Sequence, residues 1–156
     1  MIELMTEPTS QLDNRMHAGH VLVIYDGQCG LCSRTVRWLL RRDRHARLRF
    51  IGAESPRAAG LIARSGIASS PGTRPSSILA VHDAETPQER IDSRSEAIRT
   101  VLRELPQPWP FAAAALGLVS RSLRDLAYQF IARLRHRLGP RSCPAFTPAE
   151  RQRFLA

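Results

Sequence analysis

The chain contains no lysine, and its formal net charge of +9 comes from 23 arginines set against 14 acidic residues. Aromatic residues make up only 6% of the 156 residues, and the arginines are spread along the whole chain. Nucleic-acid-binding proteins gather basic residues on one face and place aromatic side chains there for base stacking. We therefore expect no specific nucleic-acid partner, and the arginine excess reflects genome composition as much as selection.

Long apolar runs are also missing from the sequence. The longest nearly apolar stretch, residues 109–119, is too short for a membrane-spanning helix, which needs about 20 residues. The first residues lack the basic region and apolar run of a secretory signal peptide. We expect a single-domain protein that acts in the cytoplasm without inserting into a membrane.

Cysteine is scarce, with only Cys29, Cys32 and Cys143 in the chain. Cys29 and Cys32 lie one helical turn apart, shortly after an apolar strand predicted over residues 21–25. At the start of a helix, unpaired backbone N–H groups and the helix dipole stabilise the thiolate of the first cysteine. In a reducing compartment, such a pair is more typical of catalysis or metal binding than of a permanent crosslink.

The residues after the pair indicate which thiol attacks. Cys32 shares a helical face with three apolar residues, Val36, Leu39 and Leu40, while arginines occupy the other faces. This spacing predicts an amphipathic helix with Cys32 on its buried side. Cys29 lies outside the apolar stripe. We therefore predict that Cys29 is the exposed attacking thiol and Cys32 the buried resolving thiol of a thiol–disulfide exchange.

Asp26, at the end of the predicted strand, has two interpretations that are compatible with each other. It can form a turn with Gly27 or provide a hydrogen-bond acceptor at the entry of the helix. It can also act in catalysis, as a carboxylate that accepts the proton of the resolving thiol.

The run Tyr25-Asp26-Gly27-x-Cys29-x-x-Cys32 resembles the signature of the DCC family of thiol-disulfide oxidoreductases. A second similarity lies in residues 124–139, which match the Arg-Asp-x-x-Tyr motif and the arginine-rich stretch of that family. Leu134 and His136 replace the asparagine and tyrosine expected there. The resemblance spans about residues 21–138, and it implies a thioredoxin-like fold and exchange with protein or small-molecule thiols and disulfides.

The same resemblance implies where a substrate would bind. In the thioredoxin fold, a cis proline just before a strand lies against the cysteine pair and presents its backbone to the substrate. Pro75 has a similar place, shortly before the strand predicted at residues 78–81. We therefore expect Pro75, together with Tyr25 and Gly27, to contact the substrate.

The order of predicted elements agrees with an α/β thioredoxin-like sandwich that has additional C-terminal helices. After a flexible arm at residues 1–19, a single domain over residues 20–156 is expected to contain strands at 21–25, 48–51, 78–81 and near 89–91. Helices are expected after Cys29, from Pro56 to Ser65, and from a capping box formed by Ser93 and Glu96. The helical extension covers residues 106–156, and we expect the apolar stripe of about residues 105–138 to pack on the core and narrow access to Cys29.

Cys143 leaves an alternative open. It is either a spare cysteine, an accessory resolving thiol, or a third metal ligand beside Cys29 and Cys32. Zinc needs four nitrogen or sulfur ligands, and no histidine in the chain has zinc-finger spacing. We expect no metal and no cofactor. The competing hypothesis is a non-enzymatic redox-sensing or metal-binding module that uses all three cysteines.

Overall fold

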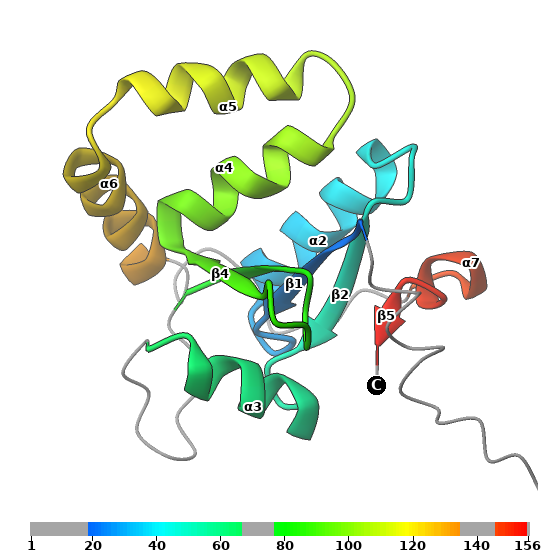
Figure 1. Ribbon diagram of the computed structural model, residues 1–156. Helices are drawn as coiled ribbons and strands as arrows, with labels where there is room; N and C mark the ends of the chain where they lie inside the picture. The colour runs from blue at the N-terminus through cyan, green and yellow to red at the C-terminus, as the bar shows by residue number, and fades with distance from the viewer. Residues whose placement is uncertain (1–18, 67–76, 135–145, 156) are drawn as a thin grey trace, which may run out of the picture.

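The computed structural model describes residues 19–66, 77–134 and 146–155, which form a mixed sheet covered by helices (Figure 1). The strands are β1 (Val21–Tyr25), β2 (Leu48–Gly52), β3 (Leu79–His82), β4 (Arg90–Ser93) and β5 (Phe154–Leu155). The helices are α2 (Gly30–Arg42), α3 (Pro56–Arg64), α4 (Arg94–Glu104), α5 (Trp109–Leu118), α6 (Arg121–Leu134) and α7 (Pro148–Arg151).

The sheet has the strand order β4-β3-β1-β2-β5. Strand β1 is parallel to β2 and antiparallel to β3, and β4 is antiparallel to β3. This arrangement is consistent with the predicted thioredoxin-like fold, including its added C-terminal helices. Strand β5 extends the sheet by pairing parallel to β2 at the edge.

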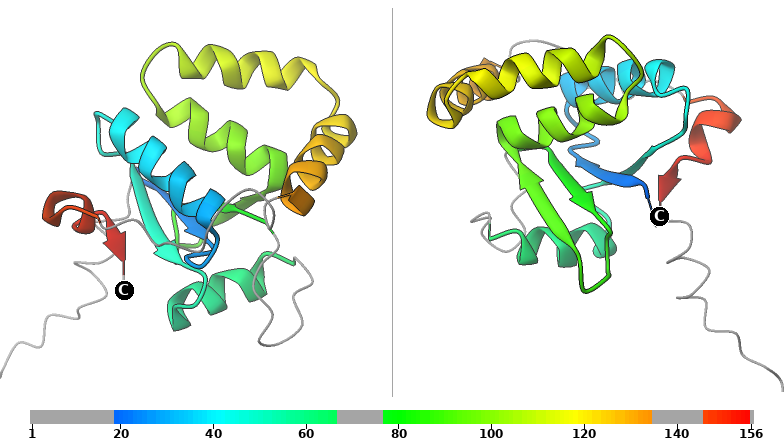
Figure 2. Two further views of the ribbon diagram at one scale, coloured as in Figure 1. Left: turned by 180° about the vertical axis from the view of Figure 1, so that it is seen from behind. Right: turned by 45° about the horizontal axis from the view of Figure 1, so that its top comes forward.

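Strand β1 lies at the centre of the sheet, and all five of its residues are buried. Because it is covered on both faces, its sequence is a continuous apolar run instead of an alternating one. Figure 2 shows α2 and α4 on one face of the sheet and α3 on the other. The apolar residues divide accordingly into two clusters, one centred on Phe50 and Leu39 and the other on Ile51 and Leu61.

The capping box predicted at the start of α4 does not form. Ser93 is the N-cap residue, but its side chain makes no capping hydrogen bond. The Glu96 carboxylate instead accepts hydrogen bonds from Arg99 and Arg124. The backbone N–H of Ser95 in the first turn donates to the carboxylate of Asp125 on α6 at 3.3 Å. The Asp125 carboxylate of α6 therefore replaces the Ser93 side chain as a hydrogen-bond acceptor for the first turn of α4.

The expectation that the apolar residues of the C-terminal helices are buried is also wrong for most of α5 and α6. Leu118 is 91% exposed and Phe130 65% exposed, and α6 has no fully buried residue. Trp109 does pack against the core, where its ring meets that of Trp38 with a centroid distance of 4.6 Å. Helix α6 is held mainly by polar contacts, described below. No helix in the described part of the chain is long and apolar enough to cross a membrane.

Candidate active site

The cysteine pair lies where β1 passes into α2. Cys29 is the N-cap residue of α2, with an extended backbone conformation, and its carbonyl oxygen accepts the N–H of Ser33 at 3.0 Å. The N–H of Cys29 itself donates to the carbonyl of Asp26 at 3.2 Å. This turn places the Cys29 thiol at the positive end of a 13-residue helix, where negative charge is stabilised.

Cys32 lies in the first turn of α2 and packs against the core cluster of that face. Its neighbours Ser33 and Val36 are fully buried. Neither Cys29 nor Cys32 is in a disulfide, and both are partly buried. Exposure alone therefore does not distinguish the two thiols. They differ in position, because Cys29 lies at the N-cap of α2 and Cys32 lies against the core.

Asp26 forms the turn that its sequence position suggests, because its Oδ1 accepts the N–H of Gln28 at 3.0 Å. Asp26 and Cys32 also line the same cavity, of ≈280 Å³, which brings the carboxylate to the side of the pair where Cys32 lies. Tyr25 borders this cavity as well, although it is only 9% exposed and packs edge-on against Phe154.

The far wall of the cavity comes from α6, about 100 residues later in the sequence. Ile131 and Ala132 face the cavity from this helix, and the hydroxyl of Tyr128 accepts the N–H of Ile78 at 2.9 Å. Helix α6 therefore lies beside the cysteine pair, although it does not bury an apolar face there.

Comparison with known proteins shows the family of the chain. The family model for the DCC1-like thiol-disulfide oxidoreductases matches residues 23–141. The chain belongs to this family. It is 28% identical over 149 residues to the uncharacterized Bacillus subtilis (strain 168) protein YuxK, covering 94% of this chain and 98% of YuxK. It is also 29% identical over 121 residues to a chloroplastic DCC family protein of Arabidopsis thaliana, covering 78% of this chain and 66% of that protein. No solved structure matches.

The stretch that matches the DCC1-like family contains both motifs, and the structure shows what the second one does. Arg124 and Asp125 of the Arg-Asp-x-x-Tyr motif bond to adjacent residues in the first turn of α4, and Tyr128 bonds to the segment just before β3. Arg124 reaches Glu96, Asp125 accepts from Ser95, and Tyr128 accepts from the backbone at the start of β3. This motif is recognisable in the sequence, but no role in the site could be assigned to it from the sequence alone.

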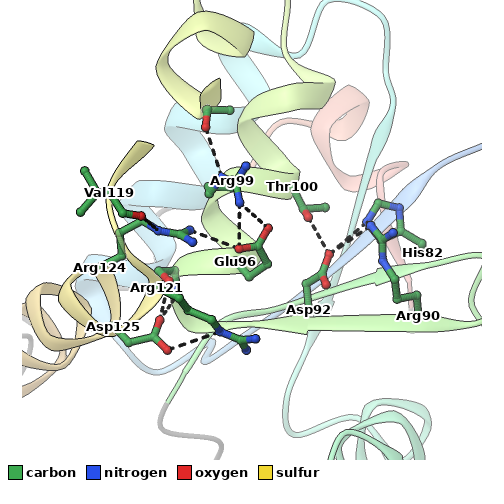
Figure 3. A network of polar contacts seen from close by, with 12 residues as sticks. His82, Arg90, Asp92, Glu96, Arg99, Thr100, Val119, Arg121, Arg124 and Asp125 are labelled. Atoms are coloured by element: carbon green, nitrogen blue, oxygen red, sulfur yellow. Dashed lines mark hydrogen bonds and ion pairs between the residues drawn. The ribbon is translucent and has the colours of Figure 1, made fainter. Parts of the chain in front are cut away.

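Figure 3 shows how Glu96 joins three helices. Its carboxylate pairs with Arg99 at 2.8 Å and with Arg124 at 3.2 Å, while Arg99 also donates to the carbonyl of Ala113 on α5. Burial opposes the charge of Glu96, but the hydrogen bonds and charges of Arg124 and Arg99 outweigh it and hold the pKa of this carboxyl below its ordinary value. Glu96 is therefore a charged anchor for both α5 and α6.

Gly27 lies against the end of the Glu54 side chain. A Cβ atom at this position would lie 2.7 Å from Oε1 of Glu54, so the end of that flexible side chain would have to shift. The exposed Glu54 side chain, which follows β2, therefore lies directly beside the turn that leads to Cys29. Sequence analysis missed this second carboxylate, because only the fold brings the ends of β1 and β2 together.

Two predicted site residues, Pro75 and Cys143, lie outside the described residues, so their predicted roles stay predictions. Within residues 19–66, 77–134 and 146–155, no group of three or more histidine, cysteine, aspartate or glutamate residues is placed to hold a metal ion. The site that the described residues do form consists of the cysteine pair, Asp26 and Tyr25, and the wall provided by α6.

Proposed function

We propose that this protein is a thiol–disulfide oxidoreductase in which Cys29 attacks and Cys32 resolves. The observation that carries the proposal is the position of Cys29 at the N-cap of α2, with Cys32 one turn later against the core. Membership of the DCC1-like family supports the same chemistry. A reducing compartment such as the cytoplasm suits this function, because there the pair is available as a dithiol.

In the proposed reaction, the Cys29 thiolate attacks one sulfur of a substrate disulfide and the substrate S–S bond breaks. One substrate thiol leaves, and the other half stays attached to Cys29 as a mixed disulfide. Cys32 then gives up its proton and attacks the Cys29 sulfur, which releases the second substrate thiol. Two electrons pass from the protein to the substrate, and the protein is left with a Cys29–Cys32 disulfide.

The order of reactivity of the two thiols tests the proposal directly. In reduced protein carrying Cys143→Ser, limiting iodoacetamide at pH 7 is expected to label Cys29 before Cys32, because the helix N-terminus stabilises the Cys29 thiolate. Peptide mass mapping after short reaction times measures both rates. The Cys29→Ser variant is the control, in which Cys32 should label slowly. Faster labelling of Cys32 would reverse the roles.

Asp26 is expected to affect the rate of resolution more than the stability of the fold. Asparagine at this position keeps the acceptor for the N–H of Gln28 but cannot take the proton of Cys32. We expect Asp26→Asn to leave stability close to that of the parent protein and to slow the decay of the mixed disulfide about tenfold or more. Asp26→Ala should also lose about 1 kcal/mol of stability, because the turn loses its acceptor.

Rapid quenching followed by mass spectrometry measures the decay of the mixed disulfide, and urea denaturation measures the stability. An Asp26→Asn variant that resolves at the parent rate would limit Asp26 to its role in the turn.

A further inference from the structure

The ≈280 Å³ cavity beside the cysteine pair has features of a binding site that neither the family description nor the reaction requires. Cys32 and Asp26 line it, so anything bound there touches Cys32 and lies within about one helical turn of Cys29. Most of the remaining wall is apolar and includes Leu31 of α2, Ile98 of α4 and Ile131 of α6. A few polar groups in a mostly apolar cavity are typical of a ligand site.

A second cavity, of ≈400 Å³, lies next to the first between α2 and α4, and Thr35, Ile78 and Ile98 line both. Trp38 and Leu102 line the second cavity further from the cysteines. Cys32 and Trp38 both belong to α2, so the two neighbouring cavities, together called the trough below, follow that helix over about 9 Å at 1.5 Å per residue. This is enough length for an aliphatic or aromatic side chain next to the sulfur of a substrate.

One buried polar group in the cavity is without a partner among the described residues. Ser77 is only 6% exposed and lines the cavity, yet its hydroxyl makes no hydrogen bond. A buried hydroxyl left unpaired is unfavourable by about 1–3 kcal/mol. The hydroxyl oxygen has almost no accessible surface, so the Ser77 side chain must rotate towards the cavity before a substrate amide or carbonyl can pair with it.

The wall that completes the cavity is held in place before any substrate arrives. Arg124, with only 8% of its side chain exposed, pairs with Glu96, and Asp125 and Tyr128 hydrogen-bond to Ser95 and Ile78 (Figure 3 shows the first two of these anchors). These contacts fix α6 by polar geometry and leave Ile131 and Ala132 available at the cavity. A preformed wall reduces the entropy that a substrate loses on binding.

We propose that this trough selects peptide disulfides in which an apolar residue is the neighbour of the reacting cysteine. The apolar side chain lies between α2 and α6, and the Ser77 hydroxyl pairs with the peptide backbone. The proposal deepens the proposed function and rests on it. The electrons still come from the Cys29–Cys32 dithiol, which is oxidised to a disulfide while the substrate is reduced to two thiols.

Two matched pairs of substrates test the selection. The peptide pair is the symmetric disulfide of Ac-Cys-Leu-NH₂ and that of Ac-Cys-Asn-NH₂, which differ little in size. The small-molecule pair is dipropyl disulfide and bis(2-hydroxyethyl) disulfide. Each terminal methyl group of the first compound is a hydroxyl group in the second. Pre-reduced protein is mixed with each disulfide, quenched with acid, and the second-order rate constant is measured by chromatography.

The reduced full-length protein is expected to favour the Leu peptide over the Asn peptide about tenfold or more, because burying a leucine side chain favours binding by about 1.5–3 kcal/mol. Ala132→Phe, which fills the cavity, should bring this ratio close to one. The matched control is Ala127→Phe, the same change on the exposed side of α6, which should keep the ratio. Circular dichroism must show that both variants are folded, because the thiols of an unfolded chain would reduce the two peptides at similar rates and bring the ratio towards one.

The Ser77→Ala variant tests whether the apolar disulfide is a peptide or a small molecule. It should slow reduction of the Leu peptide about fivefold or more and leave dipropyl disulfide unaffected, since the latter has no amide. Equal losses on both substrates would overturn the assignment of Ser77 to the peptide backbone. Equal rates for the Leu and Asn peptides, or an unchanged ratio in Ala132→Phe, would overturn the selection. If none of the four disulfides is reduced, the proposed function itself fails, and the selection fails with it.

Discussion

Replacing Cys29 with serine is expected to lower the rate constant for disulfide reduction by at least about a thousandfold. A serine hydroxyl does not ionise near neutral pH and cannot form the mixed disulfide. Cys32→Ser is expected to behave differently, because the first attack still takes place at Cys29. In that variant the reaction stops at the mixed disulfide, and the substrate stays covalently attached to the protein.

Non-reducing electrophoresis and intact mass measurement distinguish the two variants. The adduct should accumulate in Cys32→Ser and be missing in Cys29→Ser, while Cys143→Ser should turn over like the parent protein. An adduct that forms only in Cys29→Ser would assign the attack to Cys32. Stoichiometric zinc in the purified reduced protein, lost in each of the three cysteine variants, would instead favour the metal-binding module that uses Cys29, Cys32 and Cys143.

Elements encoded by local patterns were predicted well from the sequence. The continuous apolar run at residues 21–25 is strand β1, and Pro56 begins α3 as a proline in the first helical turn does. The spacing of Thr147 and Glu150 predicts a capping box at residues 147–150, and both of its reciprocal hydrogen bonds are present at α7. In each of these cases, the interactions that define the element lie within a few residues of each other.

Features that depend on distant partners were missed or predicted wrongly. Glu96 has the correct spacing for a capping box with Ser93, but Arg99 and Arg124 compete for its carboxylate, and Arg124 becomes a neighbour only when α6 docks. Strand β5 has two residues and no periodicity of its own. The wall of the cavity is a similar case, since Tyr128 and Ile78 are separated by 50 residues.

Among the described residues, the polar contact with the longest sequence separation joins Asp43 at the end of α2 to Arg153 just before β5, and it could not be predicted from the sequence. The Asp43 side chain is fully buried and accepts the backbone N–H groups of Arg47 and Leu48 at 3.1 and 2.8 Å. Arg153 donates to the same carboxylate and to the carbonyl of Leu48 at 3.0 Å. Burial, and then the charge of Arg153, lower the pKa of nearby Arg49, whereas Asp43 raises it. The Asp43 carboxylate therefore offsets the positive charges of the closely spaced Arg49 and Arg153 guanidinium groups.

Asp43→Ala is therefore expected to lower the free energy of unfolding by about 3–5 kcal/mol, because it leaves Arg153 largely buried without its counter-charge. The matched control is Glu104→Ala, which breaks the ion pair with Arg47, a residue whose side chain is 58% exposed. Exposed pairs contribute only about 0–1 kcal/mol. Urea denaturation measures both changes, and limited proteolysis should show that the segment carrying β5 becomes accessible in Asp43→Ala alone. Equal losses in the two variants would mean that Arg153 finds another acceptor and that the edge pairing of β5 with β2 does not depend on Asp43.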